Sequence, residues 1–111
     1  MIVIFIISTI SPPTISIPGH FFIATTLALR VTIAIAPHPD NRAITLLWDS
    51  PDGGAGSSFH TIDPDTSRTT FQVRLSPGTY TLQAILTHST GTVNSRQESI
   101  TIITPGGQPE G

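Results

Sequence analysis

The clearest pattern in the chain is a period-two alternation of large apolar residues with smaller or polar ones. In residues 21–36 this alternation is carried by Val31, Ile33 and Ile35, with Thr and Ala between them. Because a β-strand turns successive side chains to opposite faces, this period predicts a strand with one apolar face. The same pattern recurs in later segments: Ala43–Asp49, with Ile44, Leu46 and Trp48; Phe71–Leu75, with Val73; and Tyr80–Leu86, with Leu82 and Ala84.

Turn-forming residues separate these segments at intervals of roughly ten residues. We predict turns at residues 37–41, 63–66 and 76–78, a flexible Gly- and Pro-containing loop over residues 49–58, and a short edge strand over residues 59–62. A last strand is expected over residues 99–104. No segment has a convincing helical period. About seven strands with this turn spacing predict an all-β fold, an antiparallel β-sandwich.

The two ends of the chain differ from the middle. Residues 1–18 begin with the apolar run MIVIFIISTI and contain Pro12, Pro13 and Pro18, which we expect to separate an N-terminal strand from the rest of the chain. Residues 19–104 hold the predicted sandwich, and residues 105–111 form a polar tail rich in Pro and Gly. A length of 111 residues suits one compact domain.

Composition narrows the function classes. Thr (17) and Ile (16) dominate, and both favour extended backbone. Charged residues make up 11% of the chain and the net charge is -2, which leaves no basic field for a nucleic acid. The absence of cysteine excludes disulfides, thiolate nucleophiles and Cys-ligated metals. Low charge with many hydroxyls favours an extracellular or cell-surface location.

Two segments resemble fibronectin type III and related immunoglobulin-like modules. They are Ile44–Pro51, which contains Trp48, and Leu75–Ala84, which contains Tyr80 after a Leu-x-Pro-Gly turn; the later stretch Gly91–Ser95 adds to the likeness. The resemblance covers residues 28–104. It implies that Trp48 packs into the core, and that the Tyr80 hydroxyl hydrogen-bonds to nearby backbone as a tyrosine corner. With Phe71, Val73 and Leu82, these two residues are the expected structural core.

Candidate sites for chemistry are sparse. The four histidines, His20, His38, His60 and His88, have no metal-ligand spacing, and we expect surface positions for them rather than a ligand role. Asp49, Asp52, Asp63 and Asp65 fall in two neighbouring loops, where Asx turns are the alternative to a calcium site. We therefore assign no metal, no cofactor and no catalytic residue.

Nucleophile and phosphate motifs are also missing. Ser57, Ser58 and Ser76 lie outside any G-x-S-x-G elbow, and residues 53–56 lack the lysine of a phosphate-binding loop. Aromatic residues could stack on a sugar, although Trp48 and Tyr80 have roles in the core. We expect the protein not to be an enzyme, and a carbohydrate- or protein-binding module of a secreted or surface assembly is the alternative function.

The apolar run at residues 1–10 is too short to cross a bilayer as a helix, so we expect no transmembrane helix. An uncharged strand this apolar must be covered. It completes its own sheet, it pairs with the next subunit as a donated strand, or it is removed as a signal or anchors to a membrane. The donated strand predicts a homo-oligomer or filament. Its interface residues would be Ile2, Val3, Ile4, Phe5, Ile6, Ile7 and Ile10.

Overall fold

The structure, a computed structural model, describes residues 11–51 and 54–106. This part of the chain is built of strands and turns and contains no helix, which confirms the all-β prediction. It forms nine strands rather than about seven. They are β1 (Thr14–Ser16), β2 (Phe21–Ile23), β3 (Leu27–Ala34), β4 (Asn41–Ser50), β5 (Gly54–Thr61), β6 (Arg68–Leu75), β7 (Gly78–His88), β8 (Gly91–Asn94) and β9 (Glu98–Ile103).

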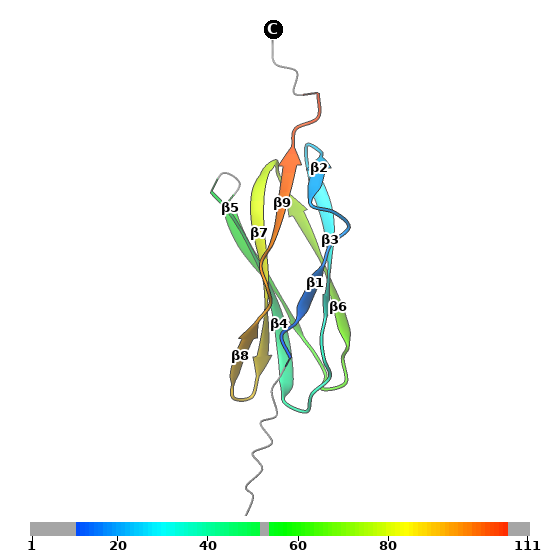
Figure 1. Cartoon of the computed structure of the whole chain (residues 1–111), viewed down its shortest axis with the longest axis vertical. Coiled ribbons are helices and arrows are strands. Elements are labelled where there is room, and N and C mark those ends of the chain that lie inside the picture. The colour runs from blue at the N-terminus through cyan, green and yellow to red at the C-terminus, as the bar shows by residue number, and fades with distance from the viewer. Residues whose placement is uncertain (1–10, 52–53, 107–111) are drawn as a thin grey trace, which may run out of the picture.

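Two sheets enclose one core (Figure 1). The smaller sheet has the strand order β1-β3-β6, and the larger has the order β2-β9-β7-β4-β5, with β8 also paired to β7. Every pair is antiparallel except β2 with β9, so the prediction of a wholly antiparallel fold is corrected at this edge. The reason is that the chain passes from the smaller sheet to the larger one between Ser16 and Phe21 without reversing direction.

The residues between Pro13 and Pro18 belong to the sandwich. Thr14, Ile15 and Ser16 pair with the end of β3, and the Ile15 side chain is buried in the core. Pro13 and Pro18 flank this short strand, in keeping with the preference of proline for strand ends and sheet edges. The predicted strand over residues 1–10 lies outside the described residues.

The core is filled by the inward faces of β3, β4, β6, β7 and β9, where apolar side chains alternate with outward polar ones. Four of the five expected core residues are buried: Phe71, Val73, Tyr80 and Leu82. Trp48 is only half-buried and packs against the edge of this cluster. The hydroxyl of Tyr80 donates a hydrogen bond of 2.9 Å to the carbonyl oxygen of Ser76, as expected for this residue.

The predicted loop over residues 49–58 is wrong for most of its length. Residues 49 and 50 end β4, and residues 54–58 belong to β5, which pairs with β4 along eight residues from Gly54 to Thr61. Glycine usually interrupts strand pairing, whereas Gly56 is the cross-strand partner of Trp48 and leaves room for its ring. The apolar run at residues 21–36 is likewise two strands, because residues 24–26 leave the extended pairing.

An unpredicted strand, β8, forms a hairpin with the end of β7. Between β8 and β9, Ser95 is buried and its Oγ accepts a 2.8 Å hydrogen bond from the amide of Ala84. The same hydroxyl donates to the carbonyl of Arg96, also at 2.8 Å. The Ser95 hydroxyl thus accepts the backbone hydrogen bond of Ala84 in β7 at the point where the neighbouring strand is interrupted.

Candidate functional site

The outward face of the larger sheet is nearly free of charge. Strand registers turn the odd-numbered residues of β4 from Ala43 to Asp49, and those of β5, β7 and β9, to this face, together with Phe21 and Ile23 of β2. Among these described positions the only charged side chain is Asp49. Threonine, serine and glutamine make up about half of the rest, and the others are apolar. This face is weakly polar and lacks the charges that usually keep two sheets apart.

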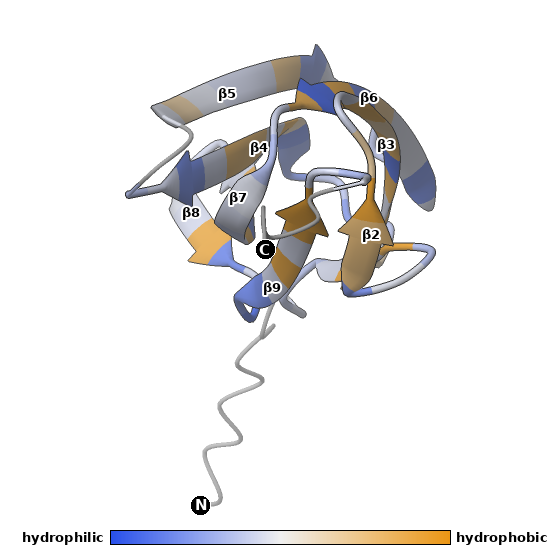
Figure 2. Cartoon of the chain, turned by 90° about the horizontal axis from the view of Figure 1, so that it is seen from above, coloured by the Kyte–Doolittle hydropathy of each residue, from blue (hydrophilic) through white to orange (hydrophobic). Residues whose placement is uncertain are grey.

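Large exposed apolar side chains gather on the same face. Phe21, Ile23, Phe59 and Ile103 are 59%, 65%, 60% and 45% exposed. Ile23 pairs directly with Ile103, and β2 and the end of β9 lie side by side as an apolar corner (Figure 2). Phe59 lies at the opposite edge, on β5. Phe21, Ile23 and Ile103 form one group, and exposed apolar side chains that are grouped rather than scattered are typical of an interaction surface.

The outward face of the smaller sheet is different. It carries Arg30, Arg68 and Arg74, three of the five arginines of the chain. These arginines are exposed, and Arg68 and Arg74 lie near the two ends of β6, which is the outer strand of its sheet. Charged residues on an outer strand disfavour the addition of another strand. The two long outer strands, β5 and β6, therefore differ in charge, which governs whether another strand can pair with an edge.

Strand β5 is an unprotected edge. It pairs only with β4, and its residues 54–61 read Gly-Ala-Gly-Ser-Ser-Phe-His-Thr, with no charge and no proline. No backbone hydrogen bond joins it to any described residue outside β4. A strand eight residues long with one row of backbone groups unpaired is a template for strand addition.

The ring of Trp48 reaches this edge. A Cβ atom built on Gly56 would overlap Cζ2 of the indole and lie 2.6 Å from its Cε2, so the ring occupies the space above the glycine. Farther along β5, His60 stacks on Phe71 of β6 with ring centroids 3.9 Å apart. The His60 Nδ1 also lies 2.8 Å from Oγ1 of Thr69. These contacts join the two sheets near the end of β5, whereas Trp48 stays half-exposed near its start.

A buried polar group lies at the end of the sandwich away from Trp48. His88 and its cross-strand partner Asn41 are 6% and 1% exposed. The amide Nδ2 of Asn41 donates to the Ala36 carbonyl at 3.0 Å. Its Oδ1 and both ring nitrogens of His88 have no hydrogen-bond partner among the described residues. The His38 ring meets that of His88 edge to face, at 6.0 Å between centroids.

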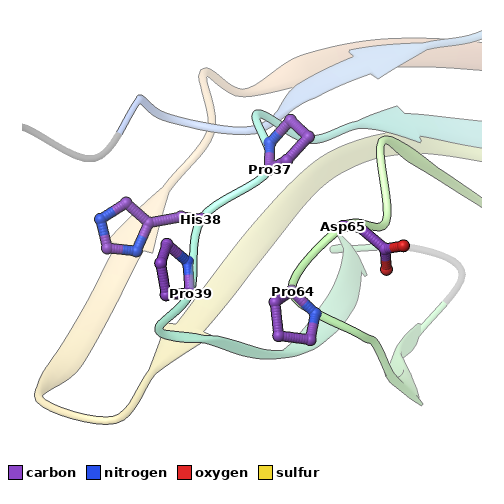
Figure 3. Close-up of a pocket in the computed structure, with 5 residues that line it drawn as sticks. All are labelled: Pro37, His38, Pro39, Pro64 and Asp65. Carbon is purple, nitrogen blue, oxygen red and sulfur yellow. The ribbon is translucent and has the colours of Figure 1, made fainter.

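Beside this group is an open hollow of about 370 Å³, lined by Pro37, His38, Pro39, Pro64 and Asp65. Its walls come from the β3–β4 turn and the loop before β6, which are tied by a 3.0 Å hydrogen bond from the His38 amide to the Pro64 carbonyl. Its two titratable side chains, His38 and Asp65, lie at opposite sides (Figure 3). In this hollow the His38 imidazole and the Asp65 carboxylate therefore do not face each other.

The other residues considered for chemistry are dispersed. The Nδ1 atom of His20 lies 2.9 Å from the carbonyl oxygen of Ser99. His20 is also distant in sequence from the other three histidines. Asp49 lies on β4, and Asp63 and Asp65 lie in the loop before β6; Asp52 is outside the described residues. Within residues 11–51 and 54–106 no three or more His, Asp or Glu side chains lie close enough to hold a metal ion. Ser57 and Ser58 lie on β5, and Ser76 accepts the Tyr80 hydrogen bond through its carbonyl.

The predicted interface residues, Ile2 to Ile7 and Ile10, lie outside the described residues. No helix in the described part of the chain is long and apolar enough to span a bilayer. The sequence analysis predicted a short edge strand over residues 59–62 but missed the extension of this strand back to Gly54, and it missed the apolar corner of Phe21, Ile23 and Ile103. The signal for the extension was the alternation of Ser57, Phe59 and Thr61 with Ser58 and His60, which continues the strand that begins among the glycines.

Neither a scan against protein-family models nor a search of curated proteins gave a match to this sequence.

Proposed function

We propose that this protein is a noncatalytic, extracellular structural subunit with an immunoglobulin-like, fibronectin type III-like fold. Two observations support this fold: the three-stranded sheet β1-β3-β6 packed on a larger sheet, and the hydrogen bond from Tyr80 to Ser76 at the start of β7. In the proposed role, the apolar segment of residues 1–10 forms a β-strand on another copy. Repetition of this heterologous contact builds a filament.

The observation that carries the proposal is the contrast between the two outward faces. The larger sheet presents an almost uncharged face and an uncharged outer strand, while three arginines lie on the smaller sheet. A protein that stays monomeric usually protects such an edge with charge, proline or a bulge. This chain has both an unprotected edge, whose backbone groups lack partners, and an uncharged apolar segment that must be covered. Pairing of the segment with the edge would satisfy both needs.

Electron microscopy and sedimentation of the full chain over a range of concentrations test this function. The matched variant is the full chain with Ile4→Lys and Ile6→Lys, which keeps β1 to β9 unchanged. We expect filaments from the parent chain and none from the variant, with the same far-ultraviolet circular dichroism for both. A parent chain that sediments as a monomer at every concentration contradicts the proposal.

A second function, binding of carbohydrate, is favoured by the exposed rings of Phe21 and Phe59 on a hydroxyl-rich face. Aromatic rings stack on the apolar faces of sugars, and neighbouring hydroxyls hydrogen-bond to their polar groups. Glycan-array binding by the Ile4→Lys, Ile6→Lys chain, lost on Phe59→Ser, would favour this alternative. Unchanged binding by the Phe59→Ser chain would speak against it.

A further inference from the structure

We infer that the β5 edge is the acceptor, and that its occupant is the residue 1–10 segment of a second copy of this chain. The inference rests on the proposed function and specifies which surface of the neighbouring copy is used. It is drawn from the chemistry of the two strands, from the position of Trp48 and from the distance that the chain must cover.

The available sheet edges differ in length and in charge. Strands β1 and β2 are three residues long, and β8 has four, so none of them offers more than a short ladder. Strands β5 and β6 each have eight residues. Arg68 and Arg74 lie on β6, whereas β5 has no charged residue. Residues 1–10 carry no charged side chain that could pair with these arginines. Added beside β6, this segment would remove the arginines from water without compensation, so β5 is the better acceptor.

The side chains of the two strands are complementary in size and polarity. Residues 2–7 are apolar without alternation, which is typical of a strand that is covered on both faces. On β5 the first two residues, Gly54 and Ala55, are small and exposed, and they leave room for Ile and Phe on a neighbouring strand. An added strand would place one row of its side chains beside the half-exposed ring of Trp48 and the other beside the exposed ring of Phe59.

Residues 1–10 cannot pair along the whole length of β5 in their own chain. Only residues 11–13 link that segment to β1, and three extended residues span at most about 10 Å. β1 lies two strand positions from β6, about 10 Å away, and β5 is in the other sheet, about a further 10 Å across the core. Residues 1–10 that pair along the whole β5 edge must therefore belong to another copy.

Two measurements locate the acceptor. Trp48 is the only tryptophan of the chain and lies at the β5 edge, so its fluorescence reports on that edge alone. We expect the emission maximum to move to shorter wavelength as filaments form, because the added strand excludes water from the ring. The Ile4→Lys, Ile6→Lys chain should show no such shift at the same concentration.

The chain contains no cysteine, which allows a clean cross-linking test between copies. A Phe5→Cys chain is mixed and oxidised with chains that each carry one cysteine on β5, at Ala55, Ser57 or Phe59. Single-cysteine chains can form a mixed disulfide only between copies. We expect the mixed dimer with at least one β5 position, and at most background levels with Thr70→Cys on β6, which is also exposed.

The outcomes separate the two proposals. Filaments with a β5 disulfide and a Trp48 shift support both. Filaments that cross-link at Thr70, or that leave the Trp48 spectrum unchanged, overturn the β5 assignment while the structural function stands. A chain that remains monomeric, with no cross-link at either strand, overturns both.

Discussion

The indole of Trp48 covers Gly56, its direct cross-strand partner between β4 and β5, and occupies the space that any larger side chain would need. This relationship explains why a stretch containing glycines can form a regular strand in this protein. A glycine on an edge strand costs conformational entropy, and here the packing of the indole on the exposed backbone offsets part of that cost.

Substitution of Gly56 by alanine should therefore destabilise the fold. The new methyl group would overlap the indole, and such overpacking typically lowers the free energy of unfolding by about 1 to 3 kcal/mol. Urea denaturation measures this change. In a Trp48→Leu background the same substitution should become neutral or stabilising, because alanine costs less entropy than glycine once the space is free. A similar loss in both backgrounds would show that the indole is not the cause.

Ser95 provides a second test, at the interruption between β8 and β9. Ser95→Ala removes the acceptor for the Ala84 amide and leaves that N–H without its side-chain partner in the interior. We expect the free energy of unfolding to fall by about 1 to 3 kcal/mol. Hydrogen exchange at the Ala84 amide should speed up more than at amides in the centre of β4. Ser99→Ala, at an exposed position, is the control and should change stability by less than about 0.5 kcal/mol.

The hydrogen bond between Tyr80 and Ser76 predicts a smaller effect. Tyr80→Phe keeps the buried ring and removes only the hydroxyl that donates to the carbonyl of the turn. The expected loss is about 1 kcal/mol in the free energy of unfolding. Thermal unfolding followed by circular dichroism measures it, with Tyr80→Leu as a comparison that also removes packing. Equal losses for the two variants would contradict a separate contribution from the hydroxyl.

At His88 the buried polar atoms predict that substitution does not lower the stability, in contrast to the three positions above. Both ring nitrogens are buried without a partner among the described residues, so His88→Leu removes groups whose desolvation opposes folding. We expect stability in urea to stay constant or to rise by about 1 kcal/mol. Leu86→Ala, on the same face of β7, should instead cost about 2 to 5 kcal/mol. A loss of more than about 2 kcal/mol for His88→Leu would mean that the imidazole makes a favourable interaction.

Local patterns were sufficient to predict the all-β class and most of the core. Val31, Ile33, Phe71 and Leu82 alternate with polar residues, and a period of two leaves little choice of which face is buried. The same alternation and the family resemblance favour a core position for Trp48, but it lies at the end of a ladder next to an outer strand, and only the tertiary structure reveals that position. Strand pairing between sequence-distant segments, such as β2 with β9, likewise leaves no local signal.

The candidate site depends on strand order, which is why the sequence could supply only half of it. The apolar segment of residues 1–10 was evident from composition, whereas its proposed acceptor is defined by which strand lies outermost. Gly54, Ala55 and Gly56 resemble loop residues because their propensity disfavours pairing, and the contacts with β4 override it. The sequence therefore indicates a donor and a short edge strand over residues 59–62, whereas the full length of the β5 edge, from Gly54 to Thr61, emerges only from the tertiary structure.

Charge on the outer strands gives the last prediction. If β6 is protected by Arg68 and Arg74, then introducing arginine on β5 should protect that edge as well. We expect Ser57→Arg to raise the concentration needed for filament formation by about tenfold or more, since burying an unpaired guanidinium beside an added apolar strand costs more than the roughly 1.4 kcal/mol that a factor of ten represents. Ser57 is exposed on the outward face, so the folded subunit should be unaffected in urea denaturation. The matched control is Thr70→Arg, because Thr70 is exposed and lies on β6, an outer strand of the smaller sheet. This substitution should leave the concentration needed for filament formation unchanged. Equal effects of the two substitutions would point to general charge repulsion between copies and away from strand addition at β5.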